Sequence, residues 1–233
     1  MKTVILCGGK GSRLVEETFA KPKPMINIGE KPILCHIMEI FQYYGFNDFI
    51  LAAGYKKEII EKYFSNTNGF QNVSVVDTGS ETMTGGRILR LKKILKDEER
   101  FFMTYGDAVS DINISKLLEF HKAHQKIATV TAVHPPVRFG ELEVKNKTVI
   151  NFAEKPQVKS SWISGGFFVL ENKVLDYIKN DETVFEREPM ESITKEGQLM
   201  AYEHEKYWQC MDTLRDKILL NKLYAEKKAP WKK

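Results

Sequence analysis

The chain has 233 residues, which suits one large α/β domain better than two independent ones. Lysine and arginine total 35 against 31 acidic residues, a formal net charge of +4; this mild, scattered excess argues against nucleic-acid binding and suits phosphorylated substrates. No apolar run approaches the roughly 18 residues of a membrane span, and the first predicted strand leaves no room for a signal peptide. Three distant cysteines indicate neither a disulfide framework nor a zinc site. We therefore expect a cytoplasmic protein without nucleic-acid or membrane partners.

The first predicted strand, residues 2–6, runs directly into a glycine-rich turn. Glycines let the backbone approach an anion closely, and basic side chains add fixed positive charge. The P-loop pattern is absent, and the dinucleotide pattern G-x-G-x-x-G fails because Leu14 replaces its third glycine. The turn alone is also compatible with a merely tight connection. With its basic residues it predicts a phosphate site at the carboxyl end of the strand, formed by Gly8, Gly9, Gly11, Ser12, Arg13 and Lys23.

Strand and helix patterns alternate through the first half of the chain. Helices are predicted at about 32–44 and 86–96, and further strands at 49–53, 73–76 and 101–105. This alternation predicts an α/β fold with a mostly parallel sheet and helices on both faces. The string from Thr84 to Arg87 opens the second helix, where its N–H groups would meet a base or phosphate, or only form a glycine turn.

Two aspartates lie at positions that suit a metal ion. Asp107 follows the strand 101–105 after one glycine, and Asp212 begins the last predicted helix, at about 212–227. Mg²⁺ prefers one or two carboxylates together with substrate phosphates, so the pair is a candidate magnesium site. The alternative is that each residue caps a helix or forms a turn.

After about Lys126 the predicted strands become short and close together. Segments 129–133, 140–144 and 148–152 are expected to form a small antiparallel elaboration, followed by a strand at 164–170 and another at 200–204. Helices are expected near 173–179 and 189–195. The five histidines show no metal-ligand spacing, and His121 and His124 are expected to be solvated on one helix face.

Two strings in this second half suit a ligand. Pro156 biases Lys155 toward an extended backbone, which can hold a long side chain over a pocket, or merely end a strand in a turn. Gly165 and Gly166 within a strand permit close backbone contact with a ligand, or only a bulge.

Taken together, these strings resemble the sugar-phosphate nucleotidyltransferase family and, within it, the glucose-1-phosphate cytidylyltransferases. The resemblance covers nearly the whole chain. It is carried by residues 8–14, 21–25, 76–79, 83–87, 104–107, 138–140, 154–156, 165–168 and 211–217.

The resemblance implies a Rossmann-like single domain over 1–233, with 1–125 mainly nucleotide-binding and 126–233 mainly acceptor-binding. It implies transfer of CMP from CTP to a phosphorylated acceptor with release of pyrophosphate, Mg²⁺ as cofactor, and a homo-oligomer. The implied nucleotide-binding residues are Gly8, Gly9, Gly11, Ser12, Arg13, Gly86, Arg87 and Asp107. The implied metal ligands are Asp107 and Asp212, the catalytic cations are Arg13, Lys23 and Lys155, and the acceptor-binding residues are Glu154, Lys155, Ser164 and Gly165.

The chain departs from the family pattern mainly on the acceptor side. Ser164 stands where the family has asparagine, Val137 where it tends to glycine, and Cys210 where it tends to proline. The family also carries a longer segment between Phe64 and Val75. Serine lacks the amide of asparagine, which favours a non-glucose acceptor. Related bacterial capsule enzymes that resemble this family join CMP to L-glutamine phosphate, so the resemblance implies L-glutamine phosphate as one such acceptor, giving CDP-L-glutamine for capsule synthesis. The alternative is glucose 1-phosphate or another hexose 1-phosphate.

A different class of function is a catalytically inactive, CTP-binding regulator. Its signature would be the loss of Asp107, Lys155 or Asp212, and all three residues are present.

Overall fold

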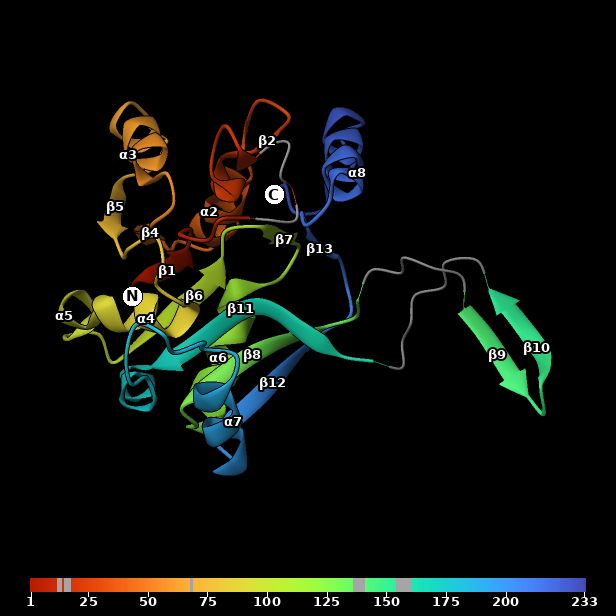
Figure 1. Ribbon diagram of the computed structural model, residues 1–233. Coiled ribbons are helices and arrows are strands. Elements are labelled where there is room, and N and C mark those ends of the chain that lie inside the picture. The colour runs from red at the N-terminus through yellow and green to blue at the C-terminus, as the bar shows by residue number, and fades with distance from the viewer. Residues whose placement is uncertain (12–13, 15–17, 68, 136–140, 154–160) are drawn as a thin grey trace.

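A seven-stranded sheet forms the centre of the protein, in a computed structural model that describes residues 1–11, 14, 18–67, 69–135, 141–153 and 161–233. Reversed strand β11 (Ile163–Glu171) is antiparallel to both of its neighbours, whereas the other pairings are parallel. The strand order is β12 (Leu199–His204), β8 (Ala128–Val133), β11, β6 (Arg100–Tyr105), β1 (Thr3–Leu6), β4 (Asp48–Ala53) and β5 (Asn72–Asp77). The predicted mostly parallel α/β sheet is confirmed (Figure 1).

The alternation of side chains along the central strands builds one apolar cluster on each face of the sheet. In β1, Ile5 joins one cluster while Val4 and Leu6 join the other. In β6, Phe102 joins the cluster that contains Ile5, and Phe101 joins the other cluster. Since successive side chains of a strand point to opposite faces, a fully apolar strand needs helices on both sides.

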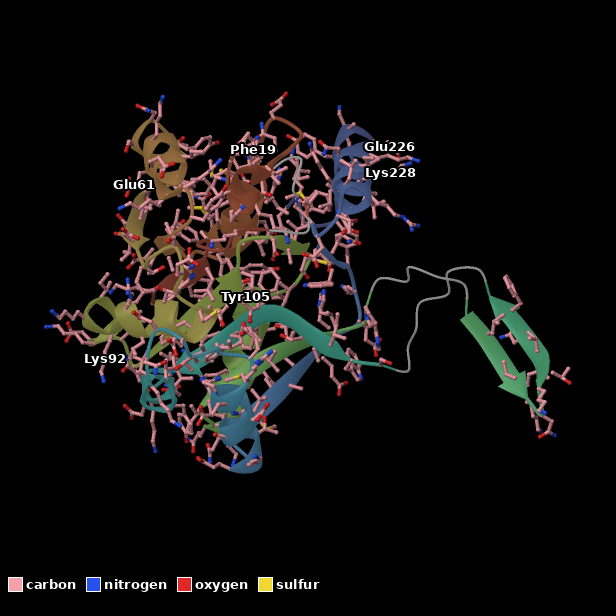
Figure 2. The ribbon with its side chains drawn as sticks, in the orientation of Figure 1. Phe19, Glu61, Lys92, Tyr105, Glu226 and Lys228 are labelled. Atoms are coloured by element: carbon pink, nitrogen blue, oxygen red, sulfur yellow. The ribbon has the colours of Figure 1, made fainter. Side chains whose placement is uncertain are left out.

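Helices cover both faces, as Figure 1 shows for α2 and α3 on one side and α4 and α5 on the other. The first cluster contains residues of α2 (Ile33–Tyr43), α3 (Lys57–Ser65), α6 (Ile114–His124) and α8 (Leu214–Ala225). The second contains residues of α4 (Thr84–Arg90), α5 (Lys92–Leu95), α7 (Glu188–Lys195) and the 3₁₀ helix η3 (Asn172–Tyr177). In Figure 2 the side chains of Lys92 and Glu226 point outward, whereas Tyr105 lies in the middle of the molecule.

In the described part of the chain, three small two-stranded sheets accompany the main one. Strand β7 (Ala108–Ser110) pairs with β13 (Trp208–Cys210), and β2 (Asn27–Ile28) pairs with β3 (Lys31–Pro32) just after the 3₁₀ helix η2 (Lys23–Met25). Strands β9 (Glu141–Lys145) and β10 (Thr148–Ala153) form a hairpin that Figure 1 shows set apart from the main sheet.

The expectation that residues 129–133 belong to this antiparallel elaboration was wrong. Strand β8 lies in the main sheet, where it is parallel to β12 and antiparallel to β11. Its side chains are nearly all buried, which requires neighbours on both edges and helices on its faces; a hairpin exposed on one side cannot provide them.

Candidate functional site

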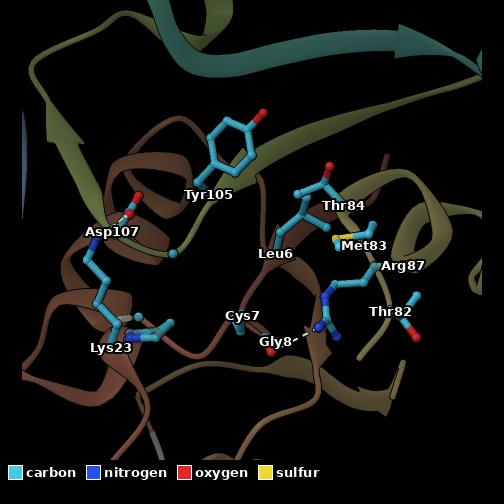
Figure 3. A pocket seen from close by; sticks show the side chains of 14 residues that line it. Leu6, Cys7, Gly8, Lys23, Thr82, Met83, Thr84, Arg87, Tyr105 and Asp107 are labelled. Carbon is cyan, nitrogen blue, oxygen red and sulfur yellow. Dashed lines mark hydrogen bonds and ion pairs between the residues drawn. The ribbon is translucent and has the colours of Figure 1, made fainter. Parts of the chain in front are cut away.

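A cavity of about 380 Å³ opens at the carboxyl ends of β1 and β6, the edge at which open α/β sheets bind ligands. Glycine backbone forms part of its wall, and a lysine–aspartate pair and the start of α4 face each other across it (Figure 3). The lining residues are Leu6, Cys7, Gly8, Gly9, Gly11, Lys23, Pro24, Thr82, Met83, Thr84, Arg87, Tyr105, Gly106 and Asp107.

The glycine turn is held against the sheet by the buried Arg87 side chain. Its guanidinium donates to the carbonyl of Gly8 at 2.9 Å, to the carbonyl of Gly79 at 2.7 Å and to the hydroxyl of Thr78 at 2.8 Å. A Cβ on Gly8 would lie 1.9 Å from Nη1 of Arg87, so only glycine allows this approach. The guanidinium thus joins the ends of β1 and β5 and fixes the floor of the cavity.

Two aspartates from distant parts of the chain meet beside this floor. Asp107 directly precedes β7, and Asp212 lies two residues beyond β13. The two strands pair with Cys210 opposite Ala108, and the N–H of Met211 donates to the carbonyl of Asp107 at 2.8 Å. The β7–β13 pairing therefore brings the carboxylates together.

Lys23 lies between the two carboxylates. Its ammonium donates to Oδ2 of Asp107 at 2.6 Å and to Oδ1 of Asp212 at 2.5 Å. Burial lowers the pKa of Lys23, but the two aspartates outweigh burial and leave that pKa above its ordinary value. The ammonium is therefore charged at neutral pH, and the carboxylates are oriented toward one small volume.

The alternative that these aspartates cap helices does not hold, whereas Asp107 does lie in a turn. Thr213 caps α8, forming a capping box with Asp216, and the side chain of Asn113 caps α6. Asp216 also accepts from the N–H of Asp212 at 3.1 Å, which orients the segment carrying that aspartate.

The donor set fits a hard divalent cation that is completed by substrate. Two carboxylate oxygens already converge on one cation, the Lys23 ammonium. Among the residues that the structure describes, no group of three or more histidine, cysteine or acidic side chains could hold a metal by itself. Mg²⁺ suits such a site because it takes one or two carboxylates together with phosphate oxygens and water.

Cys210 is half-buried in β13, two residues before Asp212. Burial, and then the charges of Asp212 and Asp107, raise the pKa of its thiol to about 12. The thiol therefore stays protonated at neutral pH and is a poor metal ligand or nucleophile.

The structure brings together only part of the predicted site. Gly8, Gly9, Gly11, Lys23, Arg87 and Asp107 line the cavity, and Asp212 joins them through Lys23. The N–H of Gly86 instead donates to the carbonyl of Thr183 at 3.3 Å, and the Arg87 guanidinium binds backbone carbonyls. Neither Ser164, which is exposed, nor Gly165, whose carbonyl accepts from Trp208 at 2.7 Å, lines the cavity. Ser12, Arg13, Glu154 and Lys155 lie outside the described residues.

Sequence reasoning missed part of the cavity wall. Tyr105 ends β6 directly before Gly106 and Asp107, and Thr82 lies just before the 83–87 string. The signal for Tyr105 was available, because the residue that ends a central parallel strand faces the ligand edge of the sheet.

Comparisons with known proteins agree with this geometry. The model of the nucleotidyl transferase family matches residues 2–224. The glucose-1-phosphate cytidylyltransferases of Salmonella typhimurium and Salmonella typhi are each 48% identical to this chain over 254 residues, covering 100% of it and 99% of the relative. The crystal structure of HddC from Yersinia pseudotuberculosis complexed with GMP-PN has a TM-score of 0.75 at 23% identity, covers 96% of this chain and 99% of that chain, and shares the fold.

Within the described part of the chain no helix is long and apolar enough to cross a membrane. The family match, the full-length identity and the cavity at the sheet edge agree with one another. The chain belongs to the nucleotidyl transferase family, in its cytidylyltransferase branch, and is an enzyme of that class.

Proposed function

We propose that the protein transfers CMP from CTP to a sugar 1-phosphate and releases pyrophosphate, with Mg²⁺ as its cofactor. The convergence of Asp107 and Asp212 on one cation beside the glycine turn is the observation that supports this proposal best. The Salmonella glucose-1-phosphate cytidylyltransferases align with this chain over nearly their whole length, which supports the choice of CTP as the nucleotide.

The reaction requires positioning more than acid–base chemistry. The acceptor phosphate is already an anion, so it attacks the α-phosphorus without a general base, and the main obstacle is repulsion between two polyanions. When bound, Mg²⁺ would be held by Asp107 and Asp212, would neutralise phosphate charge and would help to orient the displacement. Lys23 places a fixed positive charge beside these carboxylates. We further propose that Arg13 binds nucleotide phosphates and Lys155 binds the acceptor phosphate.

Glucose 1-phosphate is the acceptor that the relatives favour, because it is named in both Salmonella proteins. We therefore place it first. The sequence-based preference for another acceptor depends chiefly on Ser164, which is exposed at the start of β11 beside an irregularity in its pairing with β8.

L-Glutamine phosphate remains a second candidate. A serine at position 164 removes an amide that could both donate to and accept from a sugar hydroxyl. The Ser164→Asn variant tests this point. If glutamine phosphate is the better acceptor, the variant should move the ratio of kcat/KM values toward glucose 1-phosphate by roughly tenfold.

The proposed function is tested by pyrophosphate release from CTP and Mg²⁺ in the presence of glucose 1-phosphate, a second hexose 1-phosphate or L-glutamine phosphate, with the products identified by mass spectrometry. We expect release that depends on both the acceptor and the metal, and a CDP-linked product. Equal turnover with UTP, or no release with any sugar phosphate, would contradict the proposal.

A further inference from the structure

Residues 181–186, called here the strap, cross the N-terminal end of α4 at the edge of the cavity. The N–H of Met83 donates to the carbonyl of Asp181 at 2.8 Å, and the N–H of Gly85 donates to that of Thr183 at 2.9 Å. A Cβ on Gly86 would lie 2.5 Å from the Cα of Asp181, so glycine permits this close contact. Carbonyl groups of the strap therefore accept from N–H groups at the start of α4, for which the sequence suggested a base or phosphate as partner.

The carboxylate of Glu186, at the end of the strap, joins two side chains of the cavity wall. Thr84 donates its hydroxyl to Oε2 at 2.6 Å, and Tyr105 donates its hydroxyl to Oε1. The preceding residue, Phe185, is fully buried and contacts Phe168 edge-to-face. Phe168 in turn contacts Tyr105, so a rigid row of aromatic rings fixes both ends of the Tyr105–Glu186 bond.

These bonds determine the hydrogen-bonding character of this part of the wall. The Thr84 hydroxyl gives its proton to Glu186 and accepts from the N–H of Phe185 at 2.9 Å. The Tyr105 hydroxyl also gives its single proton to Glu186. Burial and then the charge of Glu186 raise the pKa of Tyr105, so the phenol keeps that proton. The two hydroxyls and the carboxylate therefore present acceptors, and no spare donor, to a ligand.

Thr84 and Tyr105 line the cavity, and the exposed Glu186 borders it through its bonds to these two side chains. Their position indicates which part of the nucleotide the group meets. Asp107 and Lys23 lie at one side of the cavity, and Thr82, Met83 and Thr84 lie at the other (Figure 3). With the α-phosphate beside the aspartate pair, the base extends toward the far side, over the exposed Met83 side chain.

We propose that Glu186 determines base specificity by accepting a hydrogen bond from the exocyclic amine of the nucleotide base. This inference rests on the proposed function and names the residue that distinguishes CTP from UTP. Cytosine carries an N–H donor at its 4-position. Uracil carries a carbonyl there, which would face a carboxylate and two hydroxyls that already donate their protons to Glu186. A site of acceptors rejects such a carbonyl because neither partner can donate.

The test compares kcat/KM for CTP and UTP in the wild-type enzyme, in Glu186→Gln and in the control Glu182→Gln, which alters an exposed strap residue of the same chemistry. The amide of glutamine supplies a donor. We expect Glu186→Gln to reduce the preference for CTP by about tenfold or more, and to raise kcat/KM for UTP in absolute terms. A merely structural role would not produce that gain. The control should keep the wild-type ratio.

A second variant, Tyr105→Phe, removes one bond to the carboxylate and leaves its charge in place. We expect this variant to reduce the CTP preference less than Glu186→Gln does. An unchanged CTP-to-UTP ratio in Glu186→Gln, or an effect confined to the acceptor, would overturn the inference while leaving the proposed function intact. A wild-type enzyme that does not use CTP would instead contradict the proposed function.

Discussion

In the proposed function Asp107 and Asp212 act through their negative charge, so an isosteric neutral replacement isolates that contribution. We expect Asp107→Asn to reduce turnover by about 10²-fold or more, because the amide cannot neutralise a divalent ion. Turnover at saturating CTP and Mg²⁺ measures the effect, and circular dichroism checks the fold. The exposed Asp176 of η3 provides a control as Asp176→Asn. Near-normal turnover in Asp107→Asn would remove this residue from the metal site.

His121 corrects a residue-level expectation. The sequence placed it on a solvated face among lysines, but it is only 1% exposed, and its ring bonds to the hydroxyl of Thr129 at 2.8 Å and to Oε1 of Glu171 at 2.9 Å. Neighbours along the helix could not reveal this, because both partners come from strands that pack under the helix.

Acidification should destabilise the protein through this histidine. Burial lowers the pKa of His121 below its ordinary 6.5, although Glu171 opposes the shift. Between the folded pKa and about 6.5 the unfolded chain binds more protons, so the free energy of unfolding falls as pH drops through that window. Thermal melts from pH 8 to 5 should show the loss, and His121→Gln should flatten it. His134→Gln, which alters a ring stacked on Trp162, should keep the wild-type slope.

At the scale of elements, the Arg87 bonds across the strand ends should matter for stability. Arg87→Ala leaves the carbonyls of Gly8 and Gly79 without this donor and should lower the free energy of unfolding by about 2–4 kcal/mol. Gly8→Ala should also destabilise, since its Cβ would meet the guanidinium, whereas a Cβ on Gly9 meets nothing within 4 Å. Urea unfolding of Gly8→Ala and Gly9→Ala compares the two positions, and equal stabilities would show that the contact does not constrain the turn.

Local sequence patterns predicted the type of each element well, but they did not predict which strands are neighbours in the sheet. The expected strand at 101–105 and helix at 32–44 appear as β6 and α2, because a long apolar run or a steady helical period is a local signal. The expected helix at 86–96 divides into α4 and α5 at Leu91. The position of β8 depends on β12, which lies some 70 residues later, and no local pattern encodes that pairing.

The site shows the same division between local and distant information. The glycine turn and Asp107 could be found because each lies just beyond a predicted strand, and Asp212 could be found because it begins the last predicted helix. The strap could not be found, because Glu186 is 102 residues from Thr84 and 81 residues from Tyr105 in the sequence. The relatives' alignments span 254 residues against the 233 of this chain, so those proteins hold residues that this chain lacks.

At the scale of the whole molecule, the β9–β10 hairpin supports the expected homo-oligomer. Leu142 lies opposite Phe152, and Val144 lies opposite Val149, so these four exposed apolar side chains share one face of a two-stranded ribbon. An isolated ribbon is at best marginally stable in water. We therefore propose that a second copy of the chain covers this face.

Polar substitution of that face should dissociate the oligomer. We expect light scattering to give a mass above 26.9 kDa for the wild type, and a lower mass for the double variant Val144→Ser and Phe152→Ser. Lys145→Ser, a change on the opposite face of β9, should keep the wild-type mass. A monomeric wild type would contradict the assembly.

The pairing of β7 with β13 also sets the time at which the enzyme can first work in the cell. Lys23 meets Asp107 across 84 residues and Asp212 across 189. A growing chain emerges from the ribosome amino end first, so the glycine turn, Lys23 and Asp107 are exposed to solvent well before the second carboxylate has been made. Strand β13 must then dock beside β7 after that carboxylate has been made. A nascent or prematurely terminated chain that stops before Trp208 therefore lacks half of the cation site. In the proposed function, catalysis begins only after Asp212 has been synthesised and β13 has paired with β7.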